Sequence, residues 1–174
     1  MIPIIAVVGW HNVGKTTFIE RLVQSLKQRG LRVATVKHSG GHFDMDREGT
    51  DTWRYAQAGS DVVMIAGRKR TAYLEHHEKE LTLDDLLARL PTGIDLVVAE
   101  GFKREPIPKI EVLRHDIPGE RIASPEHLVA IVSDDAAAVE QSGGAEAGWF
   151  AVDDIESVIS HLVQRGLVPS GKTN

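Results

Sequence analysis

Short unbroken runs of apolar residues alternate along this chain with segments whose apolar residues recur every three or four positions. The first run, Ile4–Val8, is typical of a strand that is buried on both faces of a sheet. Residues 16–28 then carry apolar side chains at helical spacing, and Gly30 ends that helix. Further strands are predicted at residues 31–36, 62–66, 71–74, 96–99, 109–113 and 128–132. Because strands alternate with helices, we expect right-handed crossovers and a mainly parallel sheet covered on both faces.

A polar turn separates residues 62–66 from residues 71–74 and carries the only short basic run of the chain, Arg68-Lys69-Arg70. Two strands around such a turn predict a hairpin. A basic run in a turn is usually solvated, so we do not assign it to nucleic-acid binding. A hairpin within the sheet would make the sheet mixed, although mainly parallel.

Signals for helix ends place three more helices. One is a short helix around Trp53, one begins at Thr82 with a capping-box pattern, and one covers residues 155–164. At 174 residues the chain falls in the range of a single compact domain. We expect that domain to cover residues 1–168 and to be followed by a flexible tail at residues 169–174.

The segment that joins the first strand to the first helix carries the strongest motif. Residues 9–16 read G-W-H-N-V-G-K-T and match the phosphate-binding pattern G-x-x-x-x-G-K-[ST] at every fixed position. The glycines allow backbone N–H groups to face phosphates, Lys15 would reach the β- and γ-phosphates, and the Thr16 hydroxyl would bind Mg²⁺. In this context the motif predicts a three-layer α/β P-loop NTPase fold that binds a nucleoside triphosphate. The candidate phosphate-binding residues are Gly9, His11, Asn12, Val13, Gly14, Lys15, Thr16 and Thr17.

A P-loop site also needs a carboxylate at the end of a neighbouring strand, to hold the magnesium ion or its water. Glu100 follows the apolar run 96–99 and precedes a glycine, which favours this role over that of an ordinary solvated acid. Asp44 and Asp46 lie in the polar loop after the second strand, and their i, i+2 spacing lets both face one cation. Loop-capping Asx turns explain these two acids equally well. The candidate magnesium ligands are Thr16, Asp44, Asp46 and Glu100, with Glu100 and Asp46 as candidate catalytic acids.

Two further groups of polar residues suggest chemistry without matching a specific motif. His38 and His42 share a loop with Asp44, and imidazole with carboxylate suits Zn²⁺ or Ni²⁺, although polar loop residues near a phosphate are the simpler interpretation. The guanine-reading string N-K-x-D does not occur. Asp134 follows a predicted strand, and its carboxylate would accept hydrogen bonds from guanine N1–H and the exocyclic amine. Capping of the Ala-rich segment that follows, by Asp134 or Asp135, explains this acid equally well.

Composition narrows the function classes. The chain has no cysteine, a net charge of -5 and no stretch that approaches the roughly 20 apolar residues of a membrane span. The N-terminus lacks the basic region and cleavage site of a secretory signal. We therefore expect a cytoplasmic protein without disulfides, thiolate metal sites, membrane association or nucleic-acid binding.

Several short motifs occur in an order that resembles one protein family. They lie at residues 9–17, 36–38, 43–46, 51–54, 58–59, 98–103 and 108–111. Over roughly residues 2–135 the chain resembles the MobB family of molybdopterin-guanine dinucleotide biosynthesis proteins, and the element E-G-F-K after a P-loop is the most specific part. This resemblance implies a homodimer that binds GTP and Mg²⁺, hydrolyses GTP slowly and assists the guanylyltransferase that attaches GMP to molybdopterin. Molybdopterin itself and molybdoenzyme chaperones are further implied partners.

The resemblance also implies roles for residues that match the family motifs. Phosphate would be bound by residues 14–17, and Mg²⁺ would be surrounded by the three acids already named. Lys103 would reach an anion of the nucleotide or of the pterin partner. The chain departs from the family where Ser39-Gly40-Gly41-His42 replaces most of a histidine run and where Thr50 stands in place of a usual lysine.

The leading interpretation is a GTP-binding accessory factor of molybdenum-cofactor maturation, in which the nucleotide state sets the shape presented to a partner enzyme. Two other classes stay open at this point. One is a P-loop small-molecule kinase or ATP-dependent ligase with its substrate at the carboxyl ends of the strands. The other is a nucleotide-dependent metallochaperone that uses His38 and His42. Turnover with small acceptors would indicate the first alternative, and stoichiometric bound metal would indicate the second.

Overall fold

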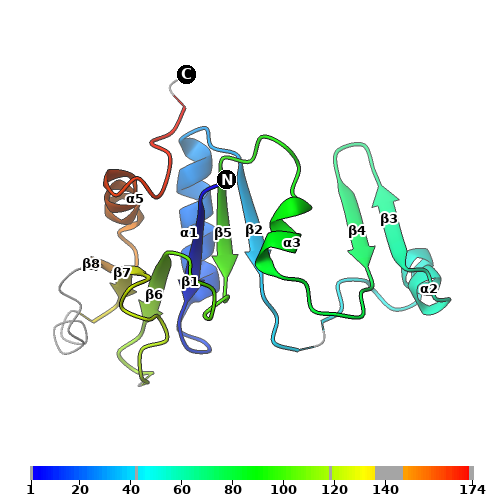
Figure 1. The fold of residues 1–174 in the computed structure, drawn as a ribbon, viewed down its shortest axis with the longest axis horizontal. Coiled ribbons are helices and arrows are strands. Elements are labelled where there is room, and N and C mark those ends of the chain that lie inside the picture. Colours follow the sequence, from blue (N-terminus) through cyan, green and yellow to red (C-terminus); the bar gives the residue numbers. More distant parts are fainter. Residues whose placement is uncertain (1, 42, 118, 136–146, 173–174) are drawn as a thin grey trace. The chain divides into compact units, whose positions relative to one another are not determined.

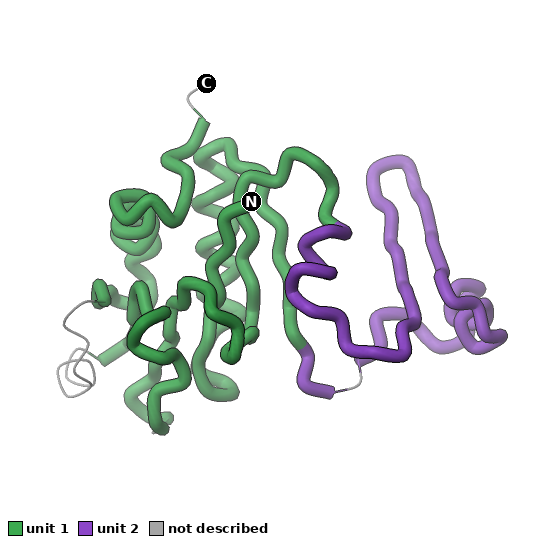
Figure 2. The backbone as a smooth tube through the Cα atoms, in the orientation of Figure 1, with its two compact units in different colours: residues 1–38, 90–174 green, residues 39–89 purple. Residues whose placement is uncertain are grey.

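The computed structural model describes residues 2–41, 43–117, 119–135 and 147–172 (Figure 1). The chain forms two compact units (Figure 2). Unit 1 consists of Met1–His38 and Leu90–Asn174, and unit 2 consists of Ser39–Arg89. One domain can contain two such units, so the single domain expected over residues 1–168 stays a prediction. Each unit has its own sheet and is described by itself.

Unit 1 is built on a 6-stranded sheet with the strand order β2-β5-β1-β6-β7-β8. Each pairing between neighbouring strands of this sheet is parallel. The strands are β1 (Ile4–Val8), β2 (Val33–Lys37), β5 (Leu96–Glu100), β6 (Lys109–Leu113), β7 (Leu128–Ser133) and β8 (Gly148–Ala151). The predicted mainly parallel α/β fold is therefore confirmed. The hairpin does not make this sheet mixed, because its two strands pair with each other in unit 2.

Two helices of unit 1, α1 (Lys15–Gln28) and α5 (Ile155–Gln164), pack against one face of this sheet (Figure 1). Both correspond to predicted helices. The core on this face contains Phe18, Leu22 and Leu26 of α1, Val158, Ile159 and Leu162 of α5, and Ile5, Val7, Val98 and Ile110 of the strands. Burial of one apolar face of each helix is the main contribution to the stability of such a layer.

The opposite face of the sheet contacts irregular segments, and two charged residues of β6 are buried there. The Lys109 ammonium donates hydrogen bonds to the backbone carbonyls of Glu105 and Ile107. Glu111 accepts a hydrogen bond from the backbone N–H of Ile122. Strand β6 therefore fixes the irregular segment before it and the irregular segment after it.

Unit 2 contains a two-stranded antiparallel sheet and two short helices. The elements are α2 (Asp51–Gln57), β3 (Val62–Ala66), β4 (Thr71–Glu75) and α3 (Leu83–Ala88). Thr50 caps α2 by accepting a hydrogen bond from the Trp53 backbone N–H. Thr82 and Asp85 form the capping box that the sequence predicts at the start of α3. The predicted hairpin and both predicted short helices are confirmed.

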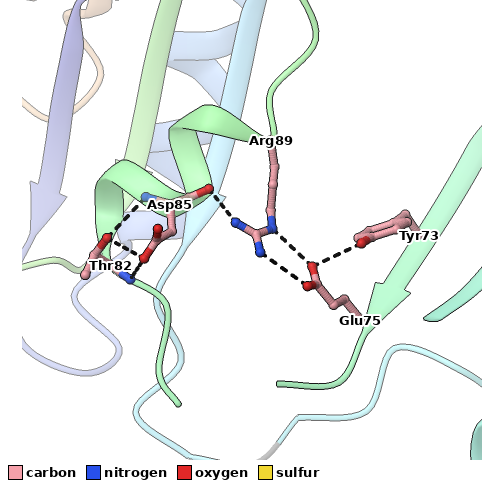
Figure 3. Close-up of polar contacts among 5 residues, drawn as sticks. All are labelled: Tyr73, Glu75, Thr82, Asp85 and Arg89. Carbon is pink, nitrogen blue, oxygen red and sulfur yellow. Dashed lines mark hydrogen bonds and ion pairs between the residues drawn. The ribbon is translucent and has the colours of Figure 1, made fainter. Parts of the chain in front are cut away.

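A charged network connects α3 to the hairpin within unit 2 (Figure 3). Arg89, which follows α3, donates hydrogen bonds through Nε and Nη2 to the two carboxylate oxygens of Glu75, at 3.1 and 3.2 Å. The Tyr73 hydroxyl also donates to Glu75, at 3.1 Å. The hydrogen bonds from Arg89 and then from Tyr73 lower the pKa of the Glu75 carboxyl, and the same carboxylate raises the pKa of Tyr73.

The hairpin of unit 2 exposes most of its large apolar side chains. Val63 is 6% exposed, whereas Met64 and Ile65 beside it are 63% and 56% exposed. The exposed large apolar residues of unit 2 are Phe43, Met45, Tyr55, Val62, Met64, Ile65 and Tyr73. Among the described residues, none of the helices in either unit is long and apolar enough to cross a membrane.

Candidate functional site

The glycine-rich loop, residues 9–17, joins β1 to α1 and needs its glycines for two different reasons. Gly9 has a φ of +148°, and a Cβ at this residue would lie 2.5 Å from the carbonyl oxygen of Val112 in β6. Gly14 stands at the N-cap of α1 with a φ of 94°, and no heavy atom lies within 4 Å of its Cβ position. Asn12 has a φ of 63°, which asparagine adopts more readily than most residues. The loop thus packs against β6 at its start and leaves open space at its end.

Lys15 lies over the loop. Its ammonium donates hydrogen bonds to the carbonyl oxygens of Gly9 at 3.0 Å and of Trp10 at 2.7 Å. Burial lowers the pKa of Lys15, the Glu100 carboxylate raises it, and the positive charge of Lys37 lowers it. A charged acceptor forms a stronger hydrogen bond with an ammonium than a neutral carbonyl does. A bound anion would therefore compete well for Lys15.

Glu100 ends β5 beside the strand that leads into the loop. In the sheet register it lies between Val7 of β1 and Lys37 of β2. Its Oε1 is 3.2 Å from the Lys37 ammonium, and its side chain is 18% exposed. Because Glu100 is two residues after the core residue Val98, its side chain lies on the face of the sheet against which α1 packs. The acid is therefore on the side of the sheet that carries the glycine-rich loop and α1.

The chain turns sharply after Glu100. Gly101 and Phe102 both have left-handed backbone, with φ values of 89° and 52°. For phenylalanine this conformation costs about 1 kcal/mol or more. The Phe102 side chain is only 8% exposed, and its ring centroid lies 5.2 Å from that of His38. Burial of Phe102 offsets the strain, and the turn leaves Lys103 exposed.

A cavity of about 190 Å³ lies beside the start of α1. Thr17 and Arg21 line it from α1, Arg114 lines it from the end of β6, and Asp134 lines it from the end of β7. The Asp134 carboxylate accepts a hydrogen bond from the His115 backbone N–H at 3.0 Å and lies 3.3 Å from Nε of Arg114. Val13 and Gly14 also line the cavity, so Asp134 lies near the end of the glycine-rich loop. The segment that Asp134 would cap in the alternative interpretation lies outside the described residues.

Sequence reasoning missed three basic residues of this region: Lys37, Arg21 and Arg114. Lys37 ends a strand parallel to β5, and the carboxyl ends of parallel strands meet at one edge of the sheet. Lys37 would have been found if this rule had been applied to basic residues as well as to acidic ones. Arg21 and Arg114 are far apart in sequence and belong to no motif. Only the packing of α1 beside the end of β6 brings them to one cavity.

Asp44 and Asp46 belong to unit 2, and Asp46 is held by its own loop. Its Oδ1 accepts hydrogen bonds from the Arg47 backbone N–H at 2.8 Å and from the Thr50 hydroxyl at 3.0 Å. Hydrogen bonding from the Thr52 hydroxyl lowers the pKa of Asp46 most, with these two donors also lowering it. Such contacts are those of a loop-capping acid. A role of Asp44 or Asp46 toward a cation stays a prediction.

Thr16 and Glu100 can be compared with the usual ligand pattern of a magnesium site. Within the described ranges, no three His, Asp or Glu side chains are grouped so as to hold a metal ion. Mg²⁺ needs no such group, because one or two carboxylates usually bind it together with substrate phosphates. Thr16 at the start of α1 and Glu100 at the end of β5 fit that pattern. His42, one of the two imidazoles in the predicted Zn²⁺ or Ni²⁺ group, lies outside the described residues.

Fold and site together define a parallel α/β protein with its candidate ligand site at the carboxyl ends of the strands, where β1 passes through a glycine-rich loop into α1. Comparison with known families makes this more specific. The family described as Molybdopterin guanine dinucleotide synthesis protein B, MobB, matches residues 4–134. The chain belongs to the MobB family, and the resemblance based on short motifs is confirmed.

Individual relatives agree with this assignment. The Molybdopterin-guanine dinucleotide biosynthesis adapter protein of Haemophilus influenzae is 38% identical over 133 residues, which are 76% of this chain and 75% of that protein. The protein of the same name from Escherichia coli is 36% identical over 140 residues, with 77% and 79% covered. The crystal structure of Bacillus subtilis MobB is similar with a TM-score of 0.72 and 28% identity, covering 97% of this chain and 99% of that one.

Proposed function

We propose that this protein is a GTP-binding adapter protein in molybdopterin-guanine dinucleotide biosynthesis, with slow Mg²⁺-dependent GTP hydrolysis. Two relatives of that name each align with about three quarters of the chain. The observation that carries nucleotide binding is the arrangement of Lys15, whose partly buried ammonium bonds two neutral carbonyls of the glycine-rich loop. Phosphate oxygens would replace those carbonyls with stronger, charge-assisted acceptors.

The triphosphate would lie over the glycine-rich loop. Backbone N–H groups at the start of α1 favour an anion there, and the open space at Gly14 allows its approach. Thr16 and Glu100 would hold Mg²⁺, directly or through water, and the ion would neutralise charge on the phosphates. Lys37 adds a positive charge beside Glu100. Asp44 and Asp46 from unit 2 are further candidate ligands of the cation. The exposed Lys103 is a further candidate to bind an anion.

The cavity at the start of α1 suits the nucleoside. Asp134 offers carboxylate oxygens that can accept from both N1–H and the exocyclic amine of guanine, whereas adenine presents an acceptor at N1. When the base enters, the Asp134 carboxylate would either release Arg114 or contact both Arg114 and the base. This pairing supports a preference for GTP over ATP.

The adapter role means that nucleotide state, rather than bulk turnover, determines what the protein presents to its partner. We propose the guanylyltransferase that attaches GMP to molybdopterin as that partner. Molybdopterin and molybdoenzyme chaperones are further candidates. The cytoplasmic location expected from the sequence stays a prediction.

We also propose a homodimer in which a second copy covers exposed apolar residues of unit 2. An isolated two-stranded hairpin is marginally stable, and each of its two strands has one edge outside the β3–β4 pair. A symmetric copy can pair such an edge with itself. Sedimentation of the wild type and of a Met64→Glu variant tests this, because the added charge should shift the protein to monomer. A wild type that sediments as a monomer would contradict the proposal.

The experiment for nucleotide binding is titration calorimetry with GTP and ATP analogues that are not hydrolysed, in the presence of Mg²⁺. Lys15→Ala should weaken GTP binding about tenfold to a hundredfold, because a charge-assisted contact contributes about 1.5–3 kcal/mol. Lys69→Ala, at an exposed lysine of the hairpin turn, is the matched control and should leave the affinity unchanged. Equal GTP affinity in both variants would refute the assignment of the loop.

A further inference from the structure

We propose that Glu111 is a positioning residue that fixes the glycine-rich loop through residues 119–123 and the Trp10 indole. Through this connection, nucleotide binding at the loop changes the position of residues 119–123. The coupling rests on the proposed function. The positioning itself is a property of the protein without nucleotide, so the two parts can be tested separately.

Glu111 is an unusual residue for the interior of a strand. Its side chain is 0% exposed, although acidic residues are rarely fully buried unless they are paired. Oε1 accepts a hydrogen bond from the Ile122 N–H at 2.6 Å, and Oε2 is buried without a hydrogen-bond partner among the described residues. Burial raises the pKa of Glu111, while backbone N–H groups of Ile122 and Ala123 and the charge of Arg121 lower it. Each stabilising group thus comes from one segment.

That segment depends on an external anchor. Residues 119–123 belong to no helix or strand, so their backbone N–H groups do not form the regular hydrogen bonds of a helix or sheet. Glu111 supplies an acceptor from β6, where its register partner is Val8 of β1. Val8 directly precedes Gly9, the first residue of the glycine-rich loop. The anchor of the segment therefore lies beside the base of the loop.

The other side of the segment holds Trp10. The indole N–H of Trp10 donates a 2.8 Å hydrogen bond to the backbone carbonyl of Glu120. A Cβ on Gly119 would lie 2.2 Å from the indole nitrogen, so the Gly119 backbone packs directly against the ring. The segment thus contacts the loop through backbone atoms, and the Glu120 side chain plays no part in the hydrogen bond.

Trp10 also connects this contact to Lys15. Its backbone carbonyl is one of the two oxygens that bind the Lys15 ammonium. When a phosphate accepts the hydrogen bonds of the Lys15 ammonium, the Trp10 carbonyl loses its donor. Trp10 can then change its position. The indole then carries this change to the Glu120 carbonyl and to the segment that Glu111 holds.

The test uses the indole N–H signal of Trp10 in ¹⁵N-labelled full-length protein. The chain has 3 tryptophans, and Trp53→Phe and Trp149→Phe variants assign the signals. Gly119→Ala should displace the indole and change the signal strongly. Glu120→Ala is the matched control on the neighbouring exposed residue, and it should leave the signal in place because the carbonyl is retained.

Glu111 is tested by an acceptor series. Glu111→Leu removes the acceptor and should raise the exchange rate of the Trp10 indole proton with water by at least about fivefold, as expected for loss of one hydrogen bond. Glu111→Gln keeps an acceptor oxygen and should restore most of the protection. If Glu111→Leu does not fold, Glu111→Asp tests the positioning role instead. This variant keeps the charge but moves the carboxylate away from Ile122, so it should also raise the exchange rate.

A folded Glu111→Leu or Glu111→Asp protein with the wild-type Trp10 signal would overturn the positioning role. Equal loss of protection in Glu111→Gln and Glu111→Leu would also overturn it. Addition of a GTP analogue with Mg²⁺ should shift the Trp10 signal of the wild type but not that of Lys15→Ala. If calorimetry detects binding and the Trp10 signal does not move, the coupling is wrong. If calorimetry detects no binding, the proposed function is wrong, and the nucleotide-free series still decides the positioning role.

Discussion

The two units of this chain use their apolar residues in opposite ways. In unit 1 the strand residue Ile110 is 0% exposed and belongs to the core that also contains Phe18 and Leu22 of α1. In unit 2 the strand residue Ile65 is 56% exposed. Parallel strands are joined by crossovers that bring helices onto the sheet, whereas a two-stranded hairpin encloses no core of its own. The comparison teaches that unit 1 buries its apolar residues in a core of its own, whereas unit 2 leaves apolar residues exposed, as the proposed homodimer requires.

Alanine substitution at these two isoleucines should separate the units most clearly. Ile110→Ala removes fully buried methylene groups and should lower the free energy of unfolding by about 2–5 kcal/mol. Ile65→Ala removes solvated surface and should change it by less than about 0.5 kcal/mol in the monomer. Urea unfolding at low protein concentration measures both. Equal effects would mean that β3 is as well covered as β6.

Glycine substitutions give the next largest difference. Gly9→Ala places a Cβ 2.5 Å from the Val112 carbonyl and keeps a φ of +148°, so it should cost at least about 2 kcal/mol and distort the loop. Gly40→Ala in unit 2 meets no heavy atom within 4 Å and should lie within about 0.5 kcal/mol of the wild type. Thermal unfolding of both variants provides the test. A Gly9→Ala protein with wild-type stability would contradict the close contact with β6.

Base selection is expected to depend on unit 1 alone. Asp134→Asn replaces one acceptor with a donor, which disfavours the guanine amine and matches the 2-oxo group of xanthine. A hydrogen bond to a charged group contributes about 1.5–3 kcal/mol, so the preference should move from GTP toward XTP by one or two orders of magnitude. Competition among GTP, XTP and ATP measures it. A variant that still ranks GTP first with full affinity would assign base reading to other groups.

The smallest expected effect concerns the charged network of unit 2. Its hydrogen bonds hold the pKa of Glu75 below the ordinary value of 4.5. A lowered folded pKa means that the contribution to stability is present above pH 4.5 and is lost as pH falls through the folded pKa. Glu75→Gln should remove this part of the acid dependence of the unfolding temperature between about pH 7 and about pH 3. An identical acid dependence in wild type and variant would show that solvent screens the network completely.

Local patterns were enough wherever one segment determines its own conformation. The strand Ile4–Val8, the glycine-rich loop and α1 follow from an apolar run, a fixed spacing of glycines and lysine, and helical periodicity. The capping box of Thr82 and Asp85 follows from a four-residue pattern. Boundaries were less well determined, since β2 begins at Val33 rather than at residue 31. The short strand β8 was not predicted, because four residues carry little periodicity.

Long-range pairing decided the rest. The sequence by itself determined a mainly parallel α/β protein of the MobB family with a phosphate-loop motif and an acid at a strand end. Only the tertiary structure decided that the hairpin forms a separate sheet, that Lys37 pairs with Glu100, and that Asp134 shares a cavity with α1. It alone showed that the buried Glu111 accepts a hydrogen bond from Ile122, and that Trp10 contacts Glu120, 110 positions further along the chain. Contacts between distant segments depend on which strands become neighbours, and no local pattern encodes that choice.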